Sequence, residues 1–219
     1  MVTRIEFEKE MSRLHEEIIR MGAQVEHAIE EAIAALIDLD AARAQVVIDQ
    51  DDIVDEMERN IDRHCVEIIA TQQPVARDLR DVTSTLKLIT DLERIADHAS
   101  DISERVIEMT RNPDRIPVPH DIVTIIRLAR KMLHGSLDAY VEKDQLIATD
   151  VIQMDNKVDD LYLRIKDYLV RMMAIDSENV PQLVEMLLVC KYAERIADHS
   201  QNVAEWVLYY IEGRLKDES

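Results

Sequence analysis

The chain of 219 residues carries 45 acidic and 26 basic side chains, and its formal net charge of −19 disfavours binding to the phosphates of nucleic acids. It contains only three glycines, five prolines and 4% aromatic residues, a composition that argues against a sheet-rich protein and is typical of an all-α one. No apolar run approaches the roughly 20 residues needed to span a bilayer, and the first six residues lack an apolar signal segment. We therefore expect a cytoplasmic protein without a transmembrane segment.

The first half of the chain contains three long stretches with helical periodicity. In the first stretch, apolar residues recur every three or four positions over about 33 residues, which predicts one helix roughly 50 Å long. These residues are Phe7, Met11, Leu14, Ile18, Met21, Val25, Ala28, Ala32 and Leu39. A second helix is expected over about 42–70, and it ends before Pro74 because proline disfavours helix in the residue that precedes it. Proline suits a first helical turn, so the third helix is expected from Pro74 to Thr110.

A proline-rich segment separates the two halves of the chain. Residues 113–119 contain three of the five prolines, so this segment is expected to be extended. Three helical stretches follow it, over about 121–141, 144–173 and 177–216. The sequence therefore predicts an all-α fold, a tandem repeat of two antiparallel three-helix bundles with six helices in all. The expected boundaries are 1–112 for the first bundle, 113–119 for the linker and 120–219 for the second bundle.

Six residues occur twice in the chain, 101 positions apart. The segment Glu-Arg-Ile-Ala-Asp-His covers 93–98 and again 194–199. A repeat spaced by about half the chain length indicates a duplicated unit. Both copies place a Glu and an Asp four residues apart, so two carboxylates lie on one helix face about 6 Å apart along the axis. A duplicated carboxylate pair suggests a duplicated site.

Each copy extends into a ladder of oxygen ligands along its helix. Aspartate pairs near the start of the second and fifth helices are expected to face these ladders, because neighbouring helices in a bundle run antiparallel. The predicted ligands are Asp51, Asp55, Glu93, Asp97 and Asp101 in the first half, and Asp155, Asp159, Glu194, Asp198 and Asn202 in the second. Four or five oxygen ligands per repeat suit a hard divalent or trivalent cation.

Solvated helix faces are the alternative interpretation of these ladders. One residue in five is acidic, so some ladders arise by chance. Like charges four residues apart cost a few tenths of a kcal/mol each, which either a metal or arginines such as Arg94 and Arg195 would offset. An all-oxygen site leaves the metal open among iron, manganese, magnesium, calcium and zinc. The uncharged Asn202 predicts that the second site is the weaker.

Other residues give less support to a reactive site. His98 and His199 point about 100° around the helix from the ladder aspartates, and we interpret them as hydrogen-bonding flank residues. Cys65 and Cys190 lack Cys-x-x-Cys spacing and are interpreted as reduced core residues. The Glu-x-x-His pair of di-iron bundles is absent at every histidine, and no phosphate loop or nucleophile motif occurs. These absences disfavour an enzyme.

The chain resembles the PhoU family of phosphate-uptake regulators over nearly its whole length. The resemblance is specific in the segment 73–80 (Gln-Pro-Val-Ala-Arg-Asp-Leu-Arg), in the two Glu-Arg-Ile-Ala-Asp segments and in the proline-rich junction. It implies a tandem of two three-helix bundles. It also implies that the acidic ligands named above fall on family motifs that hold metal ions in some members.

The resemblance further implies a non-enzymatic function. The expected role is repression of the phosphate-starvation response when phosphate is plentiful. The implied partners are the ATPase subunit of the phosphate ABC transporter and a phosphate-sensing histidine kinase. We also expect a homodimer that reaches the membrane only through these partners.

Three functions are open at this point. The first is the regulatory adaptor that the resemblance implies, with metals fixing the surface of the bundle. The second is a metalloenzyme that uses the same carboxylates for redox or hydrolytic chemistry. The third is a purely structural helical scaffold, which metal content would separate from the other two.

Overall fold

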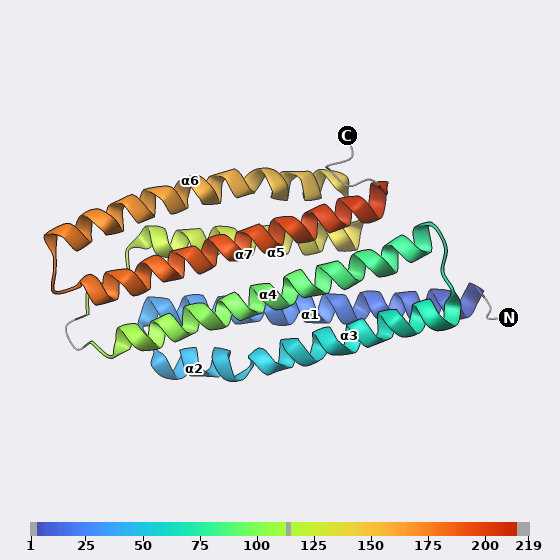
Figure 1. Cartoon of the computed structure of the whole chain (residues 1–219), viewed down its shortest axis with the longest axis horizontal. Coiled ribbons are helices and arrows are strands. Elements are labelled where there is room, and N and C mark those ends of the chain that lie inside the picture. The colour runs from blue at the N-terminus through green and yellow to red at the C-terminus, as the bar shows by residue number, and fades with distance from the viewer. Residues whose placement is uncertain (1–3, 113–114, 214–219) are drawn as a thin grey trace.

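The computed structural model describes residues 4–112 and 115–213, and α-helices make up most of these residues (Figure 1). The helices are α1 Arg4–Asp38, α2 Ala41–Asp49, α3 Asp51–Gln72, α4 Arg77–Thr110, α5 His120–Glu142, α6 Gln145–Ile175 and α7 Val180–Glu212. The described residues contain no strand, so the predicted all-α class is confirmed. None of these helices is both long and apolar enough to cross a membrane.

The helix predicted over 42–70 is divided at Gln50 into α2 and α3. If α2 and α3 are counted as one bent unit, six helical units result, as predicted. Asp51 and Asp52 occupy the first turn of α3, where their charges interact favourably with the positive end of the helix dipole. Inside a continuous helix, Asp52 would instead lie three residues from Asp49 and repel it. This charge pattern favours a new helix start at Asp51.

The third predicted helix begins at Arg77 and not at Pro74. Gln73 closes α3 in the left-handed conformation with φ 48°, and its N–H donates to the carbonyl of Ile69 at 3.2 Å. Ala76 also has a positive φ, 47°, and directly precedes α4. The chain therefore uses residues 73–76 to reverse direction, and Pro74 lies in this turn instead of a first helical turn.

The predicted outer limits of some elements cannot be compared. Pro113 and Asp114 of the linker, the first three residues and the predicted helix end at Lys216 all lie outside the described residues. Helix α7 ends at Glu212, and Gly213 follows in the left-handed region with φ 77°. That conformation is the usual end of a helix and is open to glycine without strain.

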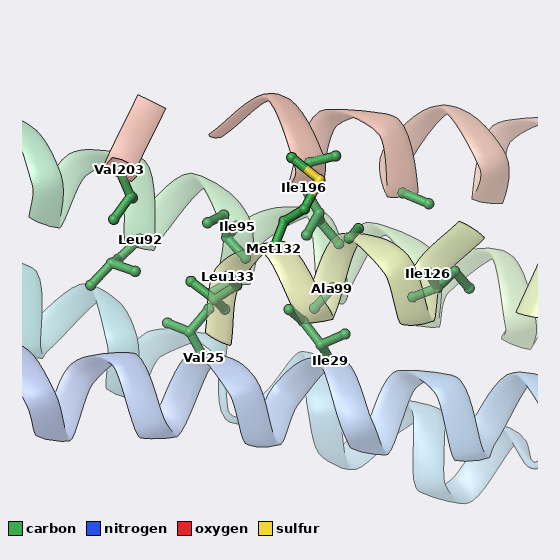
Figure 2. Close-up of a cluster of buried hydrophobic side chains, with 14 of the residues drawn as sticks. Val25, Ile29, Leu92, Ile95, Ala99, Ile126, Met132, Leu133, Ile196 and Val203 are labelled. Atoms are coloured by element: carbon green, nitrogen blue, oxygen red, sulfur yellow. The ribbon is translucent and has the colours of Figure 1, made fainter. Parts of the chain in front are cut away.

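The hydrophobic core lies between helices of both halves. The apolar stripe predicted for the first helix is buried in α1, except that Ala28 is only partly buried, as is Leu39, which follows the end of the helix. Figure 2 shows its residues Val25 and Ile29 in one cluster with side chains from α4, α5 and α7. Cys65 and Cys190 are buried and free, and burial raises the pKa of each thiol to about 12. Both cysteines are therefore core residues, as predicted.

Polar contacts hold the linker and the end of α7 in place. The buried side chain of Gln182 on α7 holds the backbone of Ile116 in the linker, accepting from its N–H at 2.8 Å and donating to its carbonyl at 2.7 Å. Arg80 of α4 donates from Nε to the carbonyl of Tyr210 at 3.2 Å, near the end of α7. Gly213 packs against the same guanidinium, so a Cβ there would overlap it. The linker and the end of α7 are thus anchored by side chains.

Candidate metal centre

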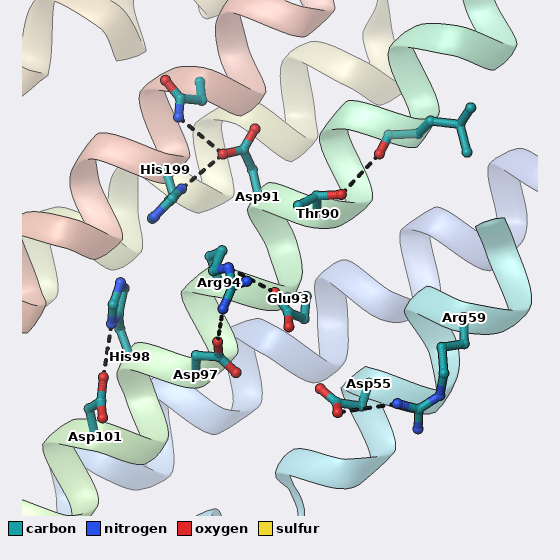
Figure 3. A network of polar contacts seen from close by, with 12 residues as sticks. Asp55, Arg59, Thr90, Asp91, Glu93, Arg94, Asp97, His98, Asp101 and His199 are labelled. Atoms are coloured by element: carbon teal, nitrogen blue, oxygen red, sulfur yellow. Dashed lines mark hydrogen bonds and ion pairs between the residues drawn. The ribbon is translucent and has the colours of Figure 1, made fainter.

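Three carboxylates of the first half converge between α3 and α4. Asp55 of α3 and Glu93 and Asp97 of α4 each offer one oxygen, and the three oxygens lie within 4.8 Å of one another (Figure 3). A hard cation such as Ca²⁺ binds oxygens at about 2.3–2.6 Å, so ligands on opposite sides of it lie up to roughly 5 Å apart. The three oxygens therefore fit around one cation with α3 and α4 in their present positions. We call these three carboxylates, together with the neighbouring Asp51 of α3, the first acidic cluster.

The electrostatics of the first acidic cluster favour a cation. Burial, followed by the negative charges of Asp97 and Asp55, raises the pKa of Asp51 to about 6. Burial also raises the pKa of Glu93, with Asp97 as the next cause. These shifts mean that ionised carboxylates are held close together at a cost in free energy. A bound cation would remove that cost.

Arginines line the exposed rim of the first acidic cluster. Arg94 donates to Asp97 at 2.8 Å and lies 3.4 Å from Glu93, and Arg59 donates to Asp55 at 3.3 Å. Both arginine side chains are more than half exposed. Ion pairs of this kind contribute about 0–1 kcal/mol, so they offset part of the repulsion and leave the carboxylates available to a metal.

The second half holds a looser set of acids between α6 and α7. We call Asp155, Asp159, Glu194 and Asp198 the second acidic cluster. Burial, followed by the negative charges of Asp159, Asp198 and Glu194, raises the pKa of Asp155 to about 6. Burial and Glu194 also raise the pKa of Asp198. Oδ1 of Asp155 is buried and has no hydrogen-bond partner among the described residues, which fits a cation ligand. Among the described residues of the second half, however, no three His, Cys, Asp or Glu side chains offer ligand atoms within 4.8 Å of one another.

Basic side chains also pair with the second acidic cluster. Lys191 donates to Glu194 at 2.5 Å, and Arg195 lies 3.6 Å from Asp198. The structure thus contains the arginine contacts that the sequence offered as the alternative to a metal. Its carboxylate geometry accommodates a cation better in the first half than in the second.

Asp101 and Asn202, the last ligand predicted in each half, lie near the interface between α4 and α7. Nδ1 of His98 contacts Asp101 at 3.0 Å. Asn202 donates to Asp91 at 3.0 Å, and Nδ1 of His199 contacts the same carboxylate at 2.8 Å. Asp101 still acts on the first acidic cluster, because its charge contributes to the raised pKa of Asp51. The interpretation of both histidines as hydrogen-bonding flank residues is confirmed.

Sequence reasoning missed three acids near these sites. Glu58 and Glu205 extend the clusters, since their charges raise the pKa of Glu93 and of Asp155 respectively. A signal existed for both, because each lies three or seven residues beyond a predicted ligand and so shares its helix face. Asp91 gave no such signal. Its partners lie 108 or more residues away, and only tertiary packing brings them to it.

The fold and the two acidic clusters define a class of protein, a duplicated helical bundle with carboxylates gathered in each half. A family model described as the PhoU domain matches this chain twice, over residues 18–106 and 122–207. The chain belongs to the PhoU family. The two matches confirm the predicted tandem repeat, whereas the exact boundaries proposed for the bundles stay a prediction.

Curated relatives and solved structures agree with this assignment. The chain is 41% identical, over 99% of both chains, to a phosphate-specific transport system accessory protein PhoU homolog of Clostridium acetobutylicum. It is 35% identical to the PhoU accessory protein of Escherichia coli, covering 95% of this chain and 86% of that one. The crystal structure of PhoU from Pseudomonas aeruginosa superposes with a TM-score of 0.90 at 36% identity, covering 95% of this chain and all of that one.

Proposed function

We propose that this protein is a cytoplasmic, non-enzymatic regulator of a phosphate-specific transport system. It represses the phosphate-starvation response when phosphate is plentiful. The observation that carries the proposal is the similarity, along 99% of the chain, to a protein named as an accessory of such a system. The relatives are named as accessory proteins and not as enzymes, which supports a regulatory role over a catalytic one.

The proposed regulator acts through other proteins. Its partners are the ATPase subunit of the phosphate ABC transporter and the phosphate-sensing histidine kinase, and it works as a homodimer. A net charge of −19 favours association with basic surfaces on such partners.

The acidic clusters give this regulator its metal sites. Asp51 and Asp55 of α3, with Glu93 and Asp97 of α4, would hold a cation in the first half, and Asp155 and its neighbours would hold one in the second. A bound cation supplies positive charge that cancels the repulsion among these carboxylates. The residues then tie α3 to α4, and α6 to α7.

Gene deletion followed by complementation tests the proposed function. A reporter driven by a phosphate-responsive promoter should stay on in rich phosphate after deletion, and the wild-type gene should restore repression. The double substitution Asp55→Asn with Asp97→Asn should fail to restore it, whereas Asp167→Asn, an exposed aspartate of α6 away from the clusters, should succeed.

The possible outcomes separate the two parts of the proposal. A reporter indifferent to deletion in both phosphate conditions would contradict the regulatory role. Full repression by the double variant would be consistent with the regulatory role but would show that repression does not require a metal in the first acidic cluster.

A further inference from the structure

The two histidines of the duplicated segments meet where α4 packs against α7. The ring centroids of His98 and His199 lie 5.7 Å apart, with their planes inclined by 32°. Their side chains are 19% and 22% exposed, so both are shielded yet reachable from solvent. They occupy equivalent positions of the two repeats, and the packing of the repeats brings them face to face.

A carboxylate orients each of the two rings. Nδ1 of His98 contacts Asp101 at 3.0 Å, and Nδ1 of His199 contacts Asp91 at 2.8 Å. An ionised carboxylate only accepts hydrogen bonds, so Nδ1 of each ring must carry the hydrogen. In a neutral imidazole the lone pair is then on Nε2, the form in which histidine binds metals.

The Nε2 atoms of both rings are free to accept a ligand. Within the described residues, His98 and His199 form hydrogen bonds only through Nδ1. Figure 3 shows that the ring nitrogen without a dashed line is directed, in each histidine, toward the space between the two rings. His64 and His134 differ, because both nitrogens of each of these rings contact carboxylates.

We propose that Nε2 of His98 and Nε2 of His199 together bind one borderline divalent cation of the Zn²⁺ and Cu²⁺ class. Imidazole suits these metals, whereas the carboxylate clusters suit harder ones. A bond of about 2.0–2.1 Å to each Nε2, with a tetrahedral angle at the metal, places the two ring centroids roughly 5 Å apart. The observed 5.7 Å requires only a small closure of the two side chains.

The surroundings of the histidine pair hold it in this geometry. The ring of His98 stacks on Tyr192 at 5.7 Å. Asp91, which orients His199, is itself held by hydrogen bonds from Asn202 and from Nε1 of Trp206, each at 3.0 Å. A carboxylate behind each histidine is the usual support for a metal-binding imidazole. Asn202, the residue that interrupts the second acidic ladder, thus supports the orienting carboxylate of His199.

Electron paramagnetic resonance of Cu²⁺ added to the full-length protein tests this site, because imidazole nitrogens give couplings that carboxylate oxygens do not. With one equivalent of Cu²⁺, the wild type should show two coordinated imidazoles, and His98→Gln and His199→Gln should each show one. Cu²⁺ affinity should fall at least about tenfold in each variant, and Asp91→Asn should weaken it by about 10–100-fold. His134→Gln is the matched control and should behave as the wild type.

A second measurement avoids variants altogether, in case a substitution disturbs folding. Diethylpyrocarbonate modifies accessible histidines, and mass spectrometry locates the modified residues. Zn²⁺ should protect His98 and His199 of the wild type and leave His134 reactive. Two coordinated imidazoles retained in either single variant, a wild-type spectrum with oxygen ligands alone, or equal modification with and without Zn²⁺ would each overturn the proposal. The inference depends on neither the acidic clusters nor the proposed regulatory function.

Discussion

Asp97 interacts with several groups of the first acidic cluster. It accepts a hydrogen bond from Arg94, and its charge raises the pKa of both Asp51 and Glu93. A residue in this position is expected to contribute strongly to the binding of a cation. A substitution of Asp97 should therefore weaken cation binding by the whole cluster.

Calorimetric titration with Mn²⁺ should resolve two unequal classes of site. Asp97→Asn keeps the size of the side chain but removes its charge, so it should weaken the tighter class at least about tenfold. Asp198→Ala should abolish the weaker class, in the second acidic cluster. Asp167→Asn serves as the control and should leave both classes intact. A single class in the wild type, or unchanged binding in both cluster variants, would argue against the assignment.

The metal-free protein should become more stable as the pH falls from 7 toward 5. Asp51 and Asp155 each have a pKa of about 6 in the folded protein, against an ordinary value of 3.8. Between these values the folded state binds more protons than the unfolded state, so lowering the pH favours folding. Urea denaturation of chelator-treated protein at each pH measures the effect. The change with pH should be smaller in Asp51→Asn, and an equal change in both proteins would contradict the role of Asp51.

At the scale of the elements, apolar periodicity predicted the long helices well but not their ends. Periodicity depends on burial along a face, which is a property summed over many residues. The break at Gln50 and the turn at 73–76 depend on one or two residues. There, the charges of Asp51 and Asp52 and the positive φ of Ala76 act locally.

The same limit applies to the candidate site. Spacing placed Asp55, Glu93 and Asp97 on facing stripes, and the structure brings them together. Spacing could not show that Asn202 donates to Asp91, because it identifies the face of a helix and not the helix that covers that face. For the same reason, spacing could not predict that His98 lies next to His199.

The linker should lose part of its anchorage when Gln182 is replaced. Gln182→Ala removes both hydrogen bonds to Ile116 and should destabilise the protein by about 1–2 kcal/mol, since the linker backbone is only part-buried and water replaces some of the lost bonding. Such a loss corresponds to a fall of roughly 2–8 °C in the melting temperature for a chain of this size. The control Gln153→Ala, at an exposed position of α6, should melt within about 1 °C of the wild type. Equal melting of the two variants would show that Gln182 does not anchor the linker.

At the scale of the whole molecule, the two halves are more closely joined than the duplication suggested. The sequence predicted two bundles with a linker between them, and each half does contain its own carboxylates. The buried residues of α1 and α4 nevertheless lie in one cluster with those of α5 and α7 (Figure 2). A repeated sequence identifies a structural unit, but whether two units share a core depends on side chains that face outward from each bundle.

The shared core leads us to expect that both halves unfold in one cooperative transition. Leu14 of α1 is fully buried in the first half, and Leu14→Ala should cost about 2–5 kcal/mol through lost contacts and a cavity. Trp206, the only tryptophan, lies on α7 in the second half and donates to Asp91 of α4, so its fluorescence reports on α7 and on its contact with the first half. If the core is shared, Leu14→Ala should lower the midpoint measured by Trp206 fluorescence as much as the midpoint measured by circular dichroism, whereas Ile5→Ala, at an exposed position of α1, should change neither. A fluorescence midpoint that stays unchanged while circular dichroism separates into two steps would show instead that 1–112 and 120–219 unfold as independent domains.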